Sequence, residues 1–221
     1  MNKFEIEVWN TKIPNSTIEY IQKAFDSRSL STGKYTKEFE VELSNIHNEN
    51  FCVCVNSGTS ALKCIAMALE LKPDDEIIIP RRSWIATVNA FHELGLKIIL
   101  ADVDSSRGLL CPNSLKSLVS DKTKAVVTVN LNGRNSISNE ILSIISKYSI
   151  PLIQDNAQSL LSSIPNRIKN IDTIQAYSFS LAKLLTTGQG GCVITDNETI
   201  ANKVKRIRTQ GLGNILRPEN W

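Results

Sequence analysis

Two residues that lie far apart in the sequence, Lys183 and Asp155, are of the types that a covalently bound carbonyl cofactor needs. Lys183 follows an apolar run and precedes the Gly-Gln-Gly-Gly stretch at 188–191. A lysine placed beside glycines and hydroxyl groups can form a Schiff base and then move a proton as a free amine. Asp155 ends another apolar run, where a carboxylate can keep a ring nitrogen protonated as part of an electron sink. The pair points to pyridoxal phosphate chemistry.

The turn from Ser57 to Ser60 is a candidate phosphate site. It offers a glycine, hydroxyl groups and the free amides of a helix N-terminus, all of which suit an anion. No Gly-Lys-Ser/Thr follows it, so it is not a nucleotide P-loop, and the glycines at 188–191 do not form a dinucleotide fingerprint. Taken alone, this turn favours a plain helix cap over a phosphate site.

Each remaining candidate also has a simpler interpretation. Trp84 can stack on a cofactor ring, yet a tryptophan in the core or at an interface is the better interpretation of that residue alone. Lys183 alone is best interpreted as an exposed lysine. Asp155 needs a partner, because burying an ionised carboxylate unpaired costs several kcal/mol. Taken together, at the carboxyl ends of successive strands, these residues make the cofactor interpretation the simpler one.

The elements that must position these residues alternate along the chain. Most of the predicted strands are continuously apolar, which is typical of strands covered by helices on both faces. We therefore predict an α/β fold with a mostly parallel sheet flanked by helices. The strands are expected at 51–55, 76–80, 97–103, 125–131, 151–155, 173–179 and 192–195. The helices are expected from about residue 16, around 39–46, 59–69 and 84–94, and at 138–148 and 198–210.

No repeat, low-complexity segment or linker divides the chain. We expect an N-terminal helical segment over 1–30, one large α/β domain over 31–211 that binds the cofactor, and a tail over 212–221 at a truncated end. Ser16 and Glu19 have the spacing of a capping box at the start of the first helix. Gly211 is expected to end the last one.

Composition narrows the class of protein. The 25 basic and 22 acidic residues give a net charge of +3 without clustering, so we expect no nucleic-acid partner. The basic residues at 203–208 are interpreted as a solvated helix end. Five cysteines in apolar patterns indicate buried thiols in a reducing compartment, and no metal site is expected. Without a leader or membrane-spanning run, we predict a cytoplasmic protein that is not bound to a membrane.

Several segments together resemble the DegT/DnrJ/EryC1/StrS family of sugar aminotransferases. The similar segments are residues 31–33 and 39–40, 57–62, 80–89 with Trp-Ile-Ala-Thr at 84–87, 154–158, and 178–191. They occur in the family's order and spacing over nearly the whole chain. The resemblance implies a fold-type I aminotransferase that uses pyridoxal phosphate to place an amino group on a nucleotide-linked keto sugar, with glutamate as the expected donor.

The resemblance also implies site roles. Lys183 would be the Schiff-base lysine and Asp155 the partner of the pyridine nitrogen. A branch of the family that removes a sugar hydroxyl has histidine at the lysine position, so lysine favours transamination. The resemblance further implies that Trp84 would stack on the cofactor ring and that Gln158 would contact the phenolic-oxygen side of the cofactor. Three residues would bind the phosphate: Gly58, Thr59 and Ser178.

The chain also departs from the family pattern. Gln189 replaces a usual glutamate, Leu161 a common glycine, and residues 130–133 a more usual His-Leu-Tyr-Gly run. Compared with the family pattern, we expect this chain to lack the family's small C-terminal domain. We therefore expect a truncated or split enzyme that forms a homodimer or associates with a separate chain carrying that domain. The alternative is a non-catalytic remnant with a binding or dimerisation role.

Overall fold

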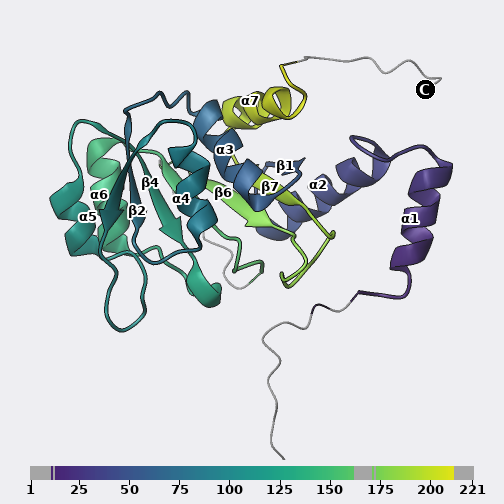
Figure 1. Ribbon diagram of the computed structural model, residues 1–221, viewed down its shortest axis with the longest axis horizontal. Coiled ribbons are helices and arrows are strands. Elements are labelled where there is room, and N and C mark those ends of the chain that lie inside the picture. The colour runs from purple at the N-terminus through teal and green to yellow at the C-terminus, as the bar shows by residue number, and fades with distance from the viewer. Residues whose placement is uncertain (1–10, 12, 162–170, 172, 212–221) are drawn as a thin grey trace, which may run out of the picture.

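A seven-stranded sheet forms the centre of the computed structural model, which describes residues 11, 13–161, 171 and 173–211 (Figure 1). The strand order across the sheet is β1-β7-β6-β5-β4-β2-β3. The strands are β1 (Phe51–Val55), β2 (Glu76–Pro80), β3 (Lys97–Ala101), β4 (Thr123–Val129), β5 (Leu152–Asp155), β6 (Thr173–Ser178) and β7 (Gly191–Thr195).

The sheet is mostly parallel, as predicted. The pairs β2/β3, β2/β4, β4/β5 and β5/β6 are parallel, whereas β7 runs antiparallel to both β1 and β6. The expected strands all exist, with ends shifted by up to two residues. Val103 lies outside β3 and forms an isolated bridge with Leu110. Strand direction is not encoded in a continuously apolar run, so the reversal at β7 follows only from the tertiary structure.

Helices cover both faces of the sheet. On one face α3 (Gly58–Ala68), α4 (Ile85–His92) and α7 (Glu198–Arg208) pack over a large apolar cluster. On the other face α2 (Lys34–His47), α5 (Pro112–Leu118) and α6 (Asn139–Tyr148) cover two smaller clusters. Figure 1 shows α5 and α6 at one end of the sheet and α2 at the other. This layering places the core between the helices and the strands and leaves the strand ends open for a site.

Helix α1 (Thr17–Asp26) differs from the sequence-based expectation. Figure 1 shows it standing apart from the sheet, and none of its side chains is buried. Ser16 precedes the helix but makes no side-chain capping hydrogen bond, so the predicted capping box does not form. The apolar side chains of Ile18 and Phe25 are exposed. The short helix α5 was not predicted, because its seven residues are too few for an apolar period to stand out.

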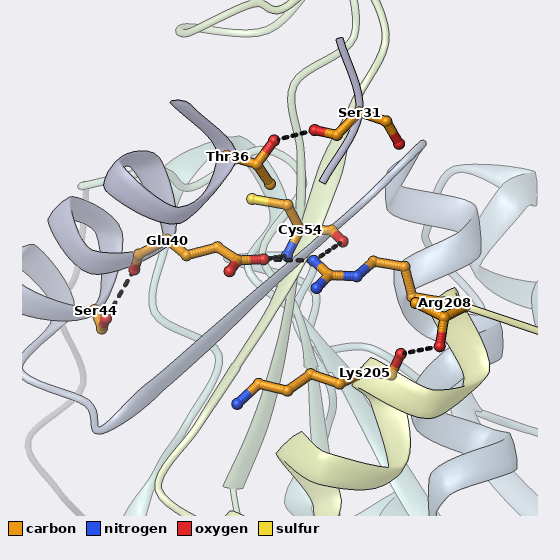
Figure 2. Close-up of polar contacts among 8 residues, drawn as sticks. Ser31, Thr36, Glu40, Ser44, Cys54, Lys205 and Arg208 are labelled. Atoms are coloured by element: carbon orange, nitrogen blue, oxygen red, sulfur yellow. Dashed lines mark hydrogen bonds and ion pairs between the residues drawn. The ribbon is translucent and has the colours of Figure 1, made fainter. Parts of the chain in front are cut away.

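Strand β1 lies at the edge of the sheet, and Glu40 and Arg208 close that edge (Figure 2). Oε1 of Glu40 accepts hydrogen bonds from the Cys54 amide at 2.8 Å and from Nη1 of Arg208 at 2.5 Å. The same Nη1 donates to the Cys54 carbonyl at 3.0 Å. Arg208 therefore does not belong to a solvated helix end, which corrects the interpretation of the basic residues at 203–208. The two side chains satisfy edge groups that would otherwise be free to pair with another strand.

The cysteine side chains are buried or partly buried free thiols, as expected. Cys52, Cys64 and Cys192 are buried free thiols, and Cys54 and Cys111 are partly buried. His47 is also buried, and its Nδ1 lies 3.2 Å from the hydroxyl oxygen of Tyr177. Burial lowers the pKa of His47, so the imidazole stays neutral within the layer beneath α2.

Candidate active site

A pocket with a volume of about 170 Å³ opens at the carboxyl ends of β1, β5 and β6. All seven residues singled out from the sequence line it, together with others that sequence reasoning did not select. The predicted members are Gly58, Thr59, Trp84, Asp155, Gln158, Ser178 and Lys183. The strand topology explains this gathering, because residues that end parallel strands, or follow them, meet at one edge of the sheet.

Asp155 is the last residue of β5, and its carboxylate is buried. Oδ2 accepts a hydrogen bond from the Thr87 hydroxyl at 2.6 Å, and Oδ1 accepts one from the Ala157 amide at 3.0 Å. Burial raises the pKa of Asp155, while these two donors and the charge of Lys183 oppose that shift. The carboxylate is thus held in place by neutral donors and lacks a close cation among the described residues.

Lys183 lies beyond β6, on a turn in which its amide donates to the Ser180 carbonyl at 3.0 Å. The side chain is half-buried and faces the same pocket as Asp155. Burial lowers the pKa of Lys183, and the nearby Asp155 charge opposes that effect. The Thr11 hydroxyl donates to the carbonyl of Lys183 at 2.7 Å and to that of Leu181 at 3.1 Å, so Thr11 braces the lysine turn.

Lys183 and Asp155 share a pocket without forming an ion pair within the described part of the chain. For both groups burial shifts the pKa towards the neutral form, and their mutual attraction is the smaller effect. The charges of Lys183 and Asp155 therefore attract each other across the pocket without direct contact. Such an arrangement fits a ligand whose own cationic group would relieve the desolvation of the carboxylate.

The N-terminus of α3 forms another part of the lining. Ser57 caps the helix by accepting from the Ser60 amide at 3.0 Å, which leaves the amides of Gly58 and Thr59 as helix N-terminal donors. A Cβ at Gly58 would lie 2.8 Å from the Cβ of Ser178. Glycine thus lets the helix N-terminus and the end of β6 approach closely. This cradle of amides and hydroxyls suits a phosphate.

Gly191 of β7 packs directly against the backbone of the turn that forms the phosphate cradle. A Cβ there would lie 2.4 Å from the carbonyl carbon of Ser57 and 2.6 Å from the amide nitrogen of Gly58. Position 191 of β7 therefore has no room for a side chain where the chain turns from β1 into α3. The close approach is a reason for glycine that the sequence pattern alone did not reveal.

Trp84 and Gln158 occupy the rim. Trp84 is the residue before α4, and 70% of its surface is exposed, so it is not a core tryptophan. Oε1 of Gln158 accepts a hydrogen bond from the Asn132 amide at 3.0 Å. Asn132 has a left-handed backbone with φ 54°. The segment at 130–133, which departs from the family pattern, is thereby tied to the pocket wall.

Sequence reasoning did not select the hydroxyl groups that serve Asp155. Ser83 donates to Thr87, and Thr87 donates to Asp155, so two hydroxyls form a relay that ends at the carboxylate. Thr87 lies in the first turn of α4, three residues after Trp84. That spacing places Thr87 near Trp84 at the start of the helix, and it was the one feature of the sequence that could have indicated Thr87 as a site residue. Its long-range partner is apparent only from the packing of α4 beside β5.

Metal-binding clusters and membrane-spanning helices are both absent from the described residues. Within these ranges, no three His, Cys, Asp or Glu side chains come together in a way that could hold a metal ion. No helix in this part of the chain is long and apolar enough to cross a membrane.

Comparisons with known proteins place this geometry among related chains. A GDP-4-keto-6-deoxy-D-mannose 3-dehydratase of Escherichia coli O55:H7 is 32% identical over 212 residues, covering 92% of this chain and 55% of its own. A solved GDP-4-keto-6-deoxymannose-3-dehydratase, described with a trapped pyridoxal phosphate–glutamate geminal diamine, is 29% identical. Its TM-score is 0.85, with 96% of this chain and 57% of that chain covered.

A third relative is DesI, solved in the presence of its TDP-sugar product. It is 25% identical with a TM-score of 0.85, covering 95% of this chain and 54% of that chain. This chain therefore spans about half the length of the relatives that it matches. The shared part has the architecture of the large domain of fold-type I aminotransferases, as predicted.

The motifs, the fold and the pocket agree with one family assignment. The profile of the DegT/DnrJ/EryC1/StrS aminotransferase family matches residues 11–220, almost the whole chain. Solved relatives carry pyridoxal phosphate, the cofactor of this family. The chain belongs to the DegT/DnrJ/EryC1/StrS aminotransferase family.

Proposed function

We propose that this chain is the large, cofactor-binding domain of a pyridoxal phosphate-dependent enzyme that transfers an amino group to a nucleotide-linked keto sugar. The observation that carries the proposal is the pairing of Lys183 with Asp155 in one pocket without an ion pair. A cofactor that bonds the lysine amine and brings a cationic ring nitrogen to the carboxylate would suit both groups in this setting.

The roles of the polar residues follow from their positions. When bound, pyridoxal phosphate supplies an electron sink for a carbanion next to the amino nitrogen. Lys183 would hold the cofactor and move a proton at its Nζ, and its lowered pKa increases the neutral fraction that this task requires. Asp155, oriented by Thr87, would face the cationic ring nitrogen. The amides of Gly58 and Thr59 and the Ser178 hydroxyl would bind the phosphate.

Two rim residues would orient the ring. The exposed face of Trp84 is available for stacking, because the side chain lines the pocket and is not packed into the core. Gln158 would contact the phenolic-oxygen side through its amide NH₂, since its Oε1 already accepts from the Asn132 backbone.

Lysine at position 183 separates two reactions within the family. The first relative is named a 3-dehydratase, whereas the family profile that matches this chain is named for aminotransferases. The dehydrating branch replaces the lysine by histidine. Because Lys183 is present and half-buried in the pocket, we favour transamination over removal of a hydroxyl.

Substrates and partners are part of the same proposal. The names of the relatives mention GDP- and TDP-linked sugars, and we propose a nucleotide sugar as acceptor with glutamate as donor, in amino-sugar or polysaccharide synthesis in the cytoplasm. We propose that the chain dimerises or binds a separate chain carrying a C-terminal domain. Helix α1 supports such an association, because Ile18, Ile21 and Phe25 expose their apolar side chains.

Absorbance spectroscopy tests the proposal. Purified chain mixed with pyridoxal phosphate should gain a visible band that Lys183→Ala abolishes, and glutamate should convert the band. If the band forms but glutamate never changes it, even with a C-terminal partner supplied, the chain is instead a cofactor-binding remnant. The absence of any band in the wild-type chain would rule out the cofactor site.

A further inference from the structure

The side chains of Arg82 and Arg134 reach the turn at 107–108, and the side chain of Arg107 reaches from that turn to the loop after β4. Nη1 of Arg134 donates to the carbonyl of Arg107 at 2.6 Å, and Nη2 of Arg107 donates to the carbonyl of Asn135 at 2.6 Å. The two loops that follow β3 and β4 are thereby clasped to each other. Arg82, from the loop after β2, packs its guanidinium on Gly108, the residue that follows Arg107. A Cβ added at Gly108 would lie 2.2 Å from Nη1 of Arg82.

The charges of these three groups, here called the rim arginines (Arg82, Arg107 and Arg134), are not neutralised by close ion pairs. Within the described residues none of them lies within 4.0 Å of a carboxylate, and Arg82 has no hydrogen bond. The neighbouring Arg81 differs, because it pairs with Asp102 at 3.0 Å.

One further carboxylate lies close by. Asp104 accepts from the amides of Arg107 and Leu109 and from the Ser106 hydroxyl, and its attraction to the Arg107 charge is only the last of the causes that lower its pKa. The Asp104 carboxylate therefore mainly accepts hydrogen bonds within its own loop. Three guanidinium groups on adjoining loops repel one another, and a bound anion would offset that repulsion.

The rim arginines are connected to the candidate active site along two short paths. Arg82 is followed directly by Ser83 and Trp84, both of which line the pocket. Arg134 lies two residues after Asn132, whose amide bonds the pocket residue Gln158. An anion on the rim arginines would therefore lie beside the pocket and apart from the phosphate cradle at the α3 N-terminus.

We propose that the rim arginines bind the diphosphate of the nucleotide-linked sugar. This inference rests on the proposed function, because it assigns a place to the charged part of the proposed acceptor. Guanidinium groups match phosphate oxygens with paired N–H donors, and a diphosphate offers enough oxygens to meet more than one of them. The sugar attached to that diphosphate would then reach the pocket past Trp84.

Titration of the purified chain with guanosine, GMP and GDP tests the subsite. Affinity should increase along this series, and Arg82→Ala should weaken GDP binding about tenfold while leaving guanosine unchanged. Arg206→Ala, which removes the same charge from the exposed side of α7, is the matched control and should leave GDP binding unchanged.

Gly108→Ala is a second variant that keeps every charge. Its added Cβ must displace the Arg82 guanidinium, and the backbone at φ 69° is itself unfavourable for alanine. It should weaken GDP binding in the same direction as Arg82→Ala, with the folded state verified by thermal unfolding. Equal GDP affinity in the wild type, Arg82→Ala and Gly108→Ala, or no preference for GDP over guanosine, would overturn the subsite.

The visible band with pyridoxal phosphate, recorded on the same samples, separates this inference from the proposed function. A chain that forms the band but binds GDP independently of Arg82 refutes the arginine subsite alone. A chain that lacks the band refutes the proposed function, and with it the assignment of the bound diphosphate to a sugar substrate.

Discussion

Thr87 donates a 2.6 Å hydrogen bond to Oδ2 of Asp155, so a helix on one face of the sheet orients the carboxylate that ends a central strand. The same threonine receives a hydrogen bond from Ser83. Because the carboxylate is buried and has no close cation among the described residues, this hydroxyl is one of only a few groups that can stabilise its charge.

Replacing Thr87 by valine should therefore destabilise the chain when Asp155 is ionised. The change removes a donor to a charged acceptor with little change of shape, and we expect a loss of about 2 kcal/mol near neutral pH. Urea unfolding measures the effect. Thr87→Ser retains the hydroxyl and should lose much less, so equal losses in the two variants would show that the hydroxyl does not support the carboxylate.

The raised pKa of Asp155 predicts a specific pH dependence in the absence of cofactor. Above the usual pKa of 3.8 the folded chain keeps the proton that the unfolded chain has released. Unfolding free energy should therefore fall as pH rises through the window between 3.8 and the raised folded pKa, by up to about 1.4 kcal/mol per pH unit. Asp155→Asn should flatten this decline in urea unfolding at pH 4 to 8. An unchanged slope would assign it to another group.

The edge clasp of Glu40 and Arg208 should contribute more to stability than an exposed ion pair. Glu40→Gln leaves the half-buried guanidinium without its anion and weakens the bond to the Cys54 amide, and we expect a loss of about 3 kcal/mol. Glu70→Gln, which breaks the exposed pair with Lys203, is the control and should change little. A double-mutant cycle with Arg208→Met measures the coupling. Similar losses at the two glutamates would contradict the clasp.

Gly191→Ala should disturb the phosphate cradle without touching a proposed ligand. The new Cβ would overlap the Ser57 carbonyl, so the turn into α3 must move, at a cost of about 1 to 3 kcal/mol. Affinity for pyridoxal phosphate should fall in parallel. Gly188→Ala meets no atom within 4 Å and differs only in its backbone strain at φ 76°. If both variants bind the cofactor like the wild type, the close approach at Gly191 has no role in the cradle.

The parts of the site that were predictable from the sequence are those encoded locally. Asp155 ends an apolar run, and Ser57 and Gly58 stand between a strand and a helix, so the sequence pattern alone places them at strand ends. The prediction of a mostly parallel sheet had the same basis, because continuous apolar runs indicate strands covered on both faces.

The remaining features depend on contacts between distant segments. The partner of Asp155 lies 68 residues away on α4, and the partner of Arg208 lies 168 residues away on α2. The antiparallel direction of β7 and the crowding at Gly191 likewise arise only when strands are paired. A pattern along the chain carries no information about these pairings, which explains why the interpretation of Arg208 as a solvated residue was wrong.

Borohydride reduction of the chain loaded with pyridoxal phosphate, followed by peptide mass spectrometry, tests the central assignment most directly. Reduction makes the link between the cofactor and its amine permanent, so the modified peptide identifies the residue. We predict that the cofactor mass is found on Lys183 in the wild type and is lost in Lys183→Ala. Labelling spread over exposed lysines such as Lys72 and Lys116, or unchanged in Lys183→Ala, would contradict the account.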